Sequence, residues 1–150
     1  LLSRIGNGDG KAAIATVAAT AQRYGFTSSE ELRTLTGMAS GNAVENWTST
    51  RDCGSFLSQV YAGTLVSKNA SERMMQLLLG QTRRTKIPAG VPSGVKVANK
   101  TGELAAVQND VAIVFGTHPY VLAVMSNDIS SAVAPSQITE LSRAVWDAAQ

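Results

Sequence analysis

Hydrophobic residues near the start of the chain recur with the period of a helix. Over residues 11–24 apolar side chains return every three or four positions, with Asp9 or Gly10 as the cap and Gly25 as the stop. The next stretch, residues 26–47, mixes Ser, Thr, Gly and Asn and keeps no sustained period of either kind. The pattern therefore predicts a helix, followed by a long ordered loop with one helical turn.

Two more helices are predicted before the middle of the chain. Ser49, with Asp52 three residues later, is typical of a helix N-terminus, and the helix that it opens closes at Gly63. Ser67 caps a second helix, which ends at Gly80. The predicted buried faces are Cys53, Phe56, Leu57 and Val60 in the first helix, and Ala70, Met74, Leu77 and Leu78 in the second.

The rest of the chain changes to short apolar runs that are typical of strands. After a segment rich in Pro and Gly, strands are predicted at residues 95–99, 111–115 and 120–125. Residues 116–119 are predicted to form a hairpin turn, so the strands on either side are antiparallel. A last helix begins at about Pro135. Its predicted inward residues are Ile138, Leu141, Val145 and Ala148.

This order of elements predicts an α+β fold with helices packed on an antiparallel sheet. The length of 150 residues fits one domain or one piece of a larger domain. Apolar residues make up 44% of the chain and charged residues 16%, which indicates a globular protein with a real core and not a disordered one.

The net charge and the cysteine content argue against several classes of function. The net charge is only +2 and no basic stripe is present, so we expect no nucleic-acid partner. Cys53 is the only cysteine and there is one histidine, so neither an intrachain disulfide nor a metal cluster can form, and no metal or other cofactor is predicted. No apolar run approaches the ~20 residues that would span a bilayer.

The candidate chemistry lies in Lys100-Thr101-Gly102, which follows the first predicted strand at what we expect to be a tight bend. Lys100 supplies a positive charge, Thr101 a hydroxyl that can share a carboxylate, and Gly102 room for a ligand near the backbone. The N–H of Glu103 would point along an exposed strand edge and help to hold a developing oxyanion. Taken alone, the tripeptide is common by chance, and an ordinary strand-end turn is the simpler explanation.

The surroundings of the tripeptide resemble the class A β-lactamases and penicillin-binding proteins, which are penicillin-recognising serine hydrolases. In that family, a Lys-Thr-Gly on a strand edge accompanies a Ser-x-x-Lys nucleophile and a Ser-Asp-Asn element. The segments here follow the order of the family's elements and cover nearly the whole chain. They are residues 46–52 (NWTSTRD), 86–92 (KIPAGVP), 95–103 (VKVANKTGE), 109–114 (NDVAIV) and 120–124 (YVLAV).

The resemblance implies that residues 1–150 are the C-terminal half of a single β-lactamase-like domain. Its helical part would be about residues 1–81, and its sheet and last helix about residues 95–150. The family's Ser-Asp-Asn element would fall just upstream of Leu1, which agrees with residues 1–5 looking like the end of a helix already under way. The resemblance therefore also implies a nucleophile before Leu1. The expected partner is the N-terminal half of the same protein or a swapped second copy, at an extracytoplasmic location.

The function implied is that of a serine hydrolase or acyltransferase that acts on β-lactams or cell-wall peptides through an acyl-enzyme. Lys100, Thr101, Gly102 and Glu103 would bind the substrate, and Lys100, Thr101 and Glu103 would also serve catalysis. The ligand would be a β-lactam or a peptidoglycan peptide. The 150-residue chain by itself is expected to be inactive.

Two other literal motif matches are interpreted differently. Ser93 and Lys96 form the only Ser-x-x-Lys of the sequence, but they belong to an extended segment, where residues three apart point to opposite faces. We interpret them as a decoy. Ser40 begins a Ser-Gly-Asn, yet it lies closer to Lys100 than the family's second element lies to its Lys-Thr-Gly, so a loop turn is the better interpretation.

Other family positions differ in this chain. Glu30 and Glu31 fall in the region of the deacylating Glu of class A enzymes, but the family pattern around that residue is not matched, so we interpret them as surface carboxylates. This puts efficient β-lactam hydrolysis in doubt. Gln108 stands about where the family often places an Arg for the substrate carboxylate, so that anchor is missing or comes from elsewhere.

The remaining chemically able residues have ordinary interpretations. His118 is a solvated turn residue, Cys53 a small buried hydrophobe, and Asp110 a turn cap or the partner of a nearby Lys or Arg. Two alternatives to the enzyme stay open. One is a non-catalytic ligand-binding or interaction module with the same fold, and the other is an unrelated α+β domain with a chance tripeptide.

Overall fold

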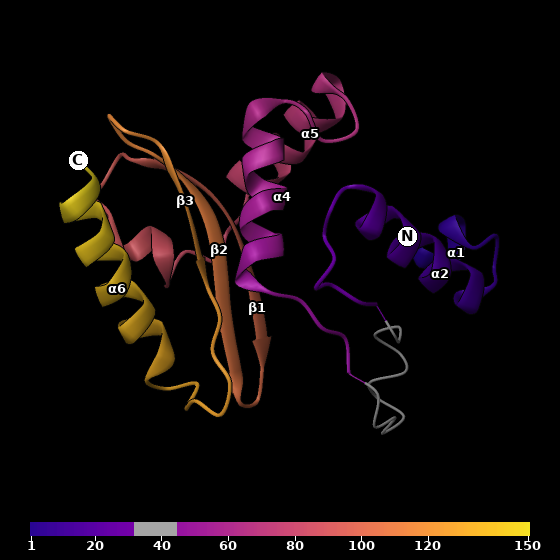
Figure 1. Ribbon diagram of the computed structural model, residues 1–150. Helices are drawn as coiled ribbons and strands as arrows, with labels where there is room; N and C mark the ends of the chain where they lie inside the picture. The colour runs from indigo at the N-terminus through magenta and orange to yellow at the C-terminus, as the bar shows by residue number, and fades with distance from the viewer. Residues whose placement is uncertain (32–44) are drawn as a thin grey trace. The chain divides into compact units, whose positions relative to one another are not determined.

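A computed structural model of the chain describes residues 1–31 and 45–150 (Figure 1). These residues form two compact units, residues 1–52 and 53–150, and each is described by itself. Among the described residues, no helix is both long enough and apolar enough to cross a membrane.

The described part of the first unit contains two helices and the two ends of a loop. Helix α1 (Leu2–Ile5) is followed by α2 (Gly10–Arg23), which confirms the helix predicted here. The Asp9 side chain caps α2, because its carboxylate accepts hydrogen bonds from Lys11 N at 2.8 Å and Ala12 N at 3.3 Å. Gly25 lies just beyond the helix with a φ of +84°, a backbone conformation that favours glycine.

The two ends of the predicted loop are held together by hydrogen bonds. Glu30 and Trp47 form an antiparallel bridge, with N···O distances of 2.8 and 3.0 Å. Asp52 accepts at its Oδ2 atom from the backbone N–H of Ser28 and the hydroxyl of Ser29, both at 2.8 Å. The Ser49 hydroxyl accepts from Asp52 N at 3.1 Å, as expected for the helix N-terminus predicted there.

The second unit contains an antiparallel sheet in the order β1-β2-β3. Its strands are β1 (Lys96–Leu104), β2 (Val107–Phe115) and β3 (Tyr120–Val124). The first two strands are longer than predicted, because Leu104 pairs with Val107 across a two-residue turn. Lys100-Thr101-Gly102 therefore lies inside β1, and the bend predicted at the tripeptide is wrong.

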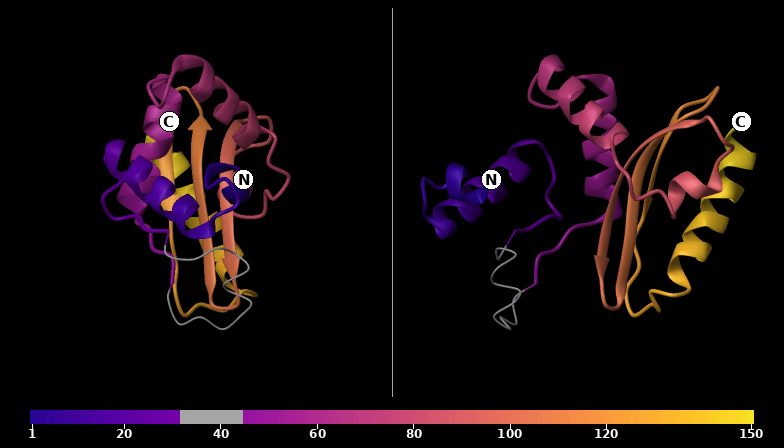
Figure 2. Two further views of the ribbon diagram at one scale, coloured as in Figure 1. Left: turned by 90° about the vertical axis from the view of Figure 1, so that its right-hand side faces the viewer. Right: turned by 180° about the vertical axis from the view of Figure 1, so that it is seen from behind.

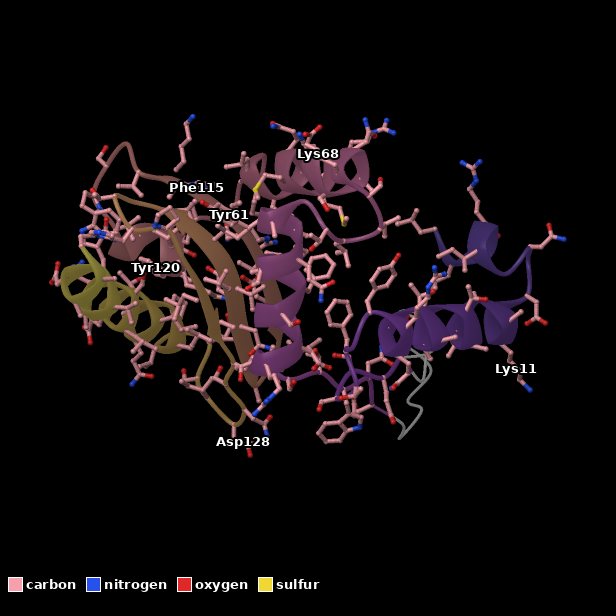
Figure 3. All side chains as sticks on the ribbon, turned by 45° about the horizontal axis from the view of Figure 1, so that its top comes forward. Lys11, Tyr61, Lys68, Phe115, Tyr120 and Asp128 are labelled. Atoms are coloured by element: carbon pink, nitrogen blue, oxygen red, sulfur yellow. The ribbon has the colours of Figure 1, made fainter. Side chains whose placement is uncertain are left out.

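Helices cover both faces of this sheet (Figures 1 and 2). On one face, Leu57 of α4 (Thr50–Ala62) packs on Ala98 and Ile113, with partly buried residues of α5 (Lys68–Leu79) beside them. Tyr61 of α4 and Phe115 of β2 lie on this side, with ring centroids 6.0 Å apart (Figure 3). The predicted α+β fold is confirmed.

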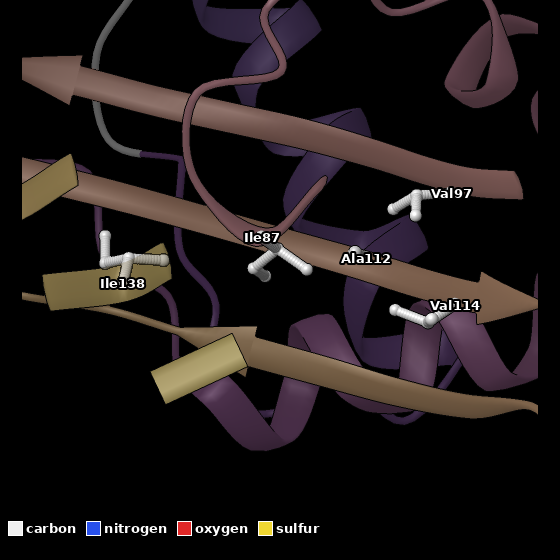
Figure 4. Close-up of a cluster of buried hydrophobic side chains, with 5 residues drawn as sticks. All are labelled: Ile87, Val97, Ala112, Val114 and Ile138. Atoms are coloured by element: carbon white, nitrogen blue, oxygen red, sulfur yellow. The ribbon is translucent and has the colours of Figure 1, made fainter. Parts of the chain in front are cut away.

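The opposite face is covered by η1 (Ile87–Gly90) and α6 (Ala134–Ala149). Side chains from both elements meet those of β1 and β2 in a buried cluster (Figure 4). The five residues are Ile87, Val97, Ala112, Val114 and Ile138. This cluster fixes η1 against the sheet close to the tripeptide strand.

Some residues predicted to be buried are on the surface. Leu77 is 79% exposed and Leu141 47% exposed, and Ala148 is also exposed. Ser71 and Ser142 are fully buried in their helices instead, and each donates its hydroxyl to a backbone carbonyl at 2.9 Å. The apolar pattern misplaced these helix faces because a small, hydrogen-bonded serine fits a close contact that a leucine would not.

Candidate functional site

The direction of the Glu103 backbone follows from hydrogen bonds on the far side of β2. Gln108 N donates to the Ser126 hydroxyl at 3.2 Å, and that hydroxyl donates to the Gln108 carbonyl at 2.6 Å. Both backbone groups of Gln108 therefore face the β3 side, away from β1. Glu103 is the cross-strand partner of Gln108, so the two form a non-hydrogen-bonded pair and Glu103 turns its N–H and carbonyl to the open edge of β1.

Two further hydrogen bonds agree with this alternation. The Val97 carbonyl accepts from Arg84 Nη1 at 3.3 Å, and the Thr101 carbonyl accepts from Lys100 Nζ. Val97, Thr101 and Glu103 are separated by even numbers of residues, so their backbone groups point to the same side of the strand. Within the ranges that the structure describes, no residue outside the sheet accepts a hydrogen bond from the Glu103 N–H.

Lys100 and Thr101 lie on opposite faces of the sheet. Lys100 shares the face of Ala98, toward α4, whereas Thr101 shares the face of Val97 and is 7% exposed. The Lys100 ammonium still reaches the edge, because it donates to the Thr101 carbonyl. Among the described residues it forms no ion pair with a carboxylate. A ligand that uses both side chains must therefore lie along the open edge.

Gly102, the residue after Thr101 in β1, is exposed. Among the described residues, a Cβ at this position would meet only side-chain atoms of Asn109, the nearest at 3.6 Å, which is ordinary van der Waals contact. Packing against these residues therefore does not require glycine here. The role predicted for Gly102, which is to leave room for a ligand, stays a prediction.

Sequence reasoning missed Lys86, which is 1% exposed. Its ammonium donates to Glu103 Oε1 and to the Asn109 carbonyl, both at 3.1 Å. Arg83 Nη1 donates to the other Glu103 oxygen at 2.9 Å. The hydrogen bond from Lys86 is the main cause that lowers the pKa of Glu103. The only sequence signal was the grouping of basic residues at positions 83, 84 and 86, which gives no sign of burial.

Asp110 is completely buried beside this group. Its carboxylate accepts from Asn99 Nδ2 and from Ile87 N, each at 3.0 Å. Burial is the largest influence on the group and raises the pKa of Asp110. Asp110 was predicted to begin a strand and cap a turn there, but it lies inside β2 and contacts the first residue of η1, 23 residues earlier in the chain. No Lys or Arg in the described residues forms an ion pair with it.

Ser93 and Lys96, which were interpreted as a decoy, do not lie on a helix. Ser93 lies in a turn and Lys96 begins β1, and both are exposed. Ser40 lies outside the described residues. Glu30 is exposed, where its backbone bridges Trp47, and Glu31 is half-buried beside it.

Gln108, His118 and Cys53 offer no chemistry at the β1 edge. Gln108 is 7% exposed and donates through Nε2 to the Leu104 carbonyl at 3.4 Å, so its side chain is turned into the hairpin. His118 is an exposed turn residue whose backbone contacts the Gln150 side chain. Cys53 is half-buried, which is less than the predicted full burial.

Comparison with known proteins gives one family. The family model described as the beta-lactamase enzyme family matches residues 9–149. No curated protein matches the chain.

Solved structures similar to this chain include PBP-A, with a TM-score of 0.80, 24% identity, and coverage of 92% of this chain and 52% of that one. A β-lactamase from Sphaerobacter thermophilus gives a TM-score of 0.82 at 23% identity, over 91% of this chain and 53% of its own. A PBP-A variant solved as an acyl-enzyme complex with penicillin G gives 0.80 at 23%, over 92% and 53%. At these identities the likeness shows the fold. The chain spans about half the length of these structures.

Proposed function

Because the chain belongs to the beta-lactamase enzyme family, we propose that it forms the Lys-Thr-Gly wall of the active site of a serine hydrolase or acyltransferase. The enzyme would react with β-lactams or cell-wall peptides through an acyl-enzyme. The observation that carries this proposal is the open edge of β1, where the Glu103 N–H points outward and the Lys100 ammonium reaches the same side.

Each group at the edge has a distinct task in this proposal. Lys100 and the Thr101 hydroxyl bind the substrate carboxylate, and Gly102 lets the substrate approach the strand. The Glu103 N–H donates to the substrate carbonyl oxygen, and this hydrogen bond strengthens as negative charge develops on that oxygen. One such donor contributes a factor of roughly 10²–10³ to kcat. The acylation step itself needs a nucleophile from another part of the protein.

We place that nucleophile in the N-terminal half of the same protein, or in a swapped second copy. The only Ser-x-x-Lys in this sequence is the one from Ser93 to Lys96, which begins in a turn and ends in a strand. Residues 1–150 would then be the C-terminal half of a single β-lactamase-like domain. The similar PBP-A variant that carries a penicillin G acyl group supports the acyl-enzyme step.

Slow release of the acyl group fits the residues better than fast hydrolysis. Neither Glu30 nor Glu31 matches the family pattern of the deacylating Glu, and Glu30 is exposed. Gln108 is turned away from the edge, so Lys100 and Thr101 are left to hold the substrate carboxylate. Acyl transfer on cell-wall peptides, outside the cytoplasm, is the reaction that we favour.

Labelling with a fluorescent penicillin tests the proposal. In the complete protein we expect a covalent fluorescent adduct that survives denaturation. Lys100→Ala should reduce the labelling rate at least tenfold, because a charge-assisted contact to the carboxylate is worth about 1.5–3 kcal/mol. Its unfolding free energy should change by no more than about 0.5 kcal/mol, as for other surface substitutions.

Lys96→Ala is the matched control, because Lys96 is an exposed lysine on the same strand. It should label like the wild type. Absence of any adduct in the complete protein would favour the non-catalytic ligand-binding or interaction module. Unchanged labelling of Lys100→Ala would reject the role given to Lys100.

A further inference from the structure

Lys86 is the largest fully buried side chain of the described residues. Lysine is almost never fully buried unless it is paired, and a buried ion pair often stabilises a protein no more than apolar residues of the same size would. Stability therefore does not explain why a lysine occupies this position. The explanation has to come from what its ammonium group holds.

The ammonium of Lys86 holds both strands of the β1–β2 hairpin beside Gly102. It donates to Glu103 Oε1 in β1 and to the Asn109 carbonyl in β2, each at 3.1 Å. Asn109 is the cross-strand partner of Gly102, and Glu103 is the next residue along β1. The Lys86 ammonium therefore contacts both strands next to the Gly102–Asn109 pair, immediately before the outward-facing N–H of Glu103.

The backbone of Lys86 is itself anchored to the core. Its carbonyl accepts from the Thr139 hydroxyl of α6 at 3.2 Å. The next residue, Ile87, has no exposed surface, donates its N–H to Asp110 at 3.0 Å and packs in the cluster of Figure 4. Lys86 is therefore a fixed point from which the ammonium can restrain the hairpin.

The Glu103 amide is in a place that benefits from such a restraint. It faces the open edge of β1, so no other strand in the described part of the chain holds its N–H in position. The residue before it is Gly102, which lacks a Cβ and so leaves the backbone more freedom than any other residue. Arg83 also contacts the Glu103 carboxylate, but its side chain is 68% exposed, and exposed ion pairs contribute little.

We propose that Lys86 is a positioning residue, which holds the Glu103 side chain so that the Glu103 N–H is aimed at the substrate carbonyl. The proposal rests on the proposed function, because it concerns the same amide. Lys86 would touch neither the substrate nor the reacting atoms. Its effect on the reaction would pass entirely through the backbone of residue 103.

Lys86→Met in the complete enzyme tests this, because methionine is apolar and of similar length. We expect the rate constant of acylation by a fluorescent penicillin to fall about tenfold, since a misaimed donor loses part of the ~10²–10³ that an oxyanion donor supplies. The dissociation constant of the initial, non-covalent complex should change less than about twofold, because the oxyanion contact strengthens in the transition state. The thermal midpoint should not fall.

Glu103→Gln is a second variant, in case Lys86→Met does not fold. It keeps an oxygen acceptor but removes the charge that pairs with Lys86, so the acylation rate constant should fall in the same way. If both residues act through one contact, the double variant should be no slower than the slower single variant. Lys96→Met is the matched control and should acylate at the wild-type rate.

Backbone ¹⁵N relaxation measured by NMR separates this proposal from the proposed function. In Lys86→Met, but not in Lys96→Met, the order parameter of the Glu103 N–H should fall, with no change at residues of the cluster in Figure 4. If the wild type is not labelled by penicillin, the proposed function fails while the relaxation result still decides whether Lys86 restrains this amide. A wild-type order parameter at Glu103, or a loss of acylation that only follows a lowered thermal midpoint, would overturn the proposal.

Discussion

Two carboxyl groups near Lys86 respond in opposite ways to their surroundings. Glu103 is partly exposed, and its hydrogen bond from Lys86 lowers its pKa. Asp110 has no exposed surface, and burial raises its pKa although Asn99 and the Ile87 N–H both donate to it. The depth of burial decides the direction of each pKa shift. Burial penalises the charged form of both carboxyl groups, but it outweighs the hydrogen bonds only for Asp110.

The raised pKa of Asp110 predicts a dependence of stability on pH. The folded state keeps the Asp110 proton to higher pH than the unfolded chain does, so the contribution of this group to stability falls as pH rises. It should be fully present below the unfolded pKa of about 3.9 and lost as pH rises through the folded pKa. Asp110→Asn should remove this decline and still accept from the Ile87 N–H. Denaturant unfolding of both proteins between about pH 3 and pH 7 measures how the free energy of unfolding depends on pH.

Asp147→Asn is a suitable control for this experiment, because Asp147 is exposed on α6. Glu103 contributes with the opposite sign, since its lowered pKa gives stability that is lost as pH falls through that pKa. Glu103 is present in both proteins, so its contribution cancels in the difference between the unfolding free energies of the wild type and Asp110→Asn. The same slope with pH in both proteins would contradict the prediction.

At the scale of elements, β1 is a strand with two unlike sides. Lys100 and Gly102 direct their backbone groups to β2, whereas Thr101 and Glu103 direct theirs to the open edge. An open edge is a place where an added chain can pair, and here it carries the candidate site. The site therefore depends on the register between β1 and β2, which sets these directions.

This alternation predicts a pattern of amide hydrogen exchange along β1. The amides of Lys100 and Gly102 should exchange at least an order of magnitude more slowly than those of Thr101 and Glu103, since only the former are bonded within the ladder. Exchange followed by NMR in the complete protein measures each amide separately. Similar protection of all four amides would show that Glu103 does not face an open edge.

At the scale of the whole molecule, the chain spans about half the length of the similar solved structures. The proposed function requires a helical Ser-x-x-Lys, and the one such sequence in this chain is in a turn and a strand. The part of the enzyme that attacks the substrate and the part that holds the substrate would then be contributed by different segments.

Complementation tests this arrangement. The 150-residue chain expressed alone should not be labelled by fluorescent penicillin, because it supplies the binding wall without the nucleophile. Co-expression with the N-terminal half should restore labelling, with the adduct on the N-terminal chain when the two are separated by electrophoresis. An adduct on the isolated 150-residue chain would contradict the proposed division of roles.

Local sequence signals were sufficient to predict where three helices start and which family the chain resembles. Asp9, Ser49 and Ser67 each cap the helix that they were predicted to start, because a cap needs only residues two or three positions away. The resemblance around Lys100-Thr101-Gly102 agrees with the matching family model. The polar character of residues 100–103 hid the full length of β1, because its pairing with β2 is not a property of either segment alone.

Tertiary structure alone decided which groups are buried and which face the edge. Lys86 meets Glu103, and Ile87 meets Asp110, across gaps of 17 and 23 residues that no local pattern describes. The outward direction of the Glu103 N–H depends on Ser126 beyond β3 as well as on the register of β1 with β2. Residue types and spacing therefore determined that a Lys-Thr-Gly wall could exist. Cross-strand pairing and burial decided where its groups point and what holds them.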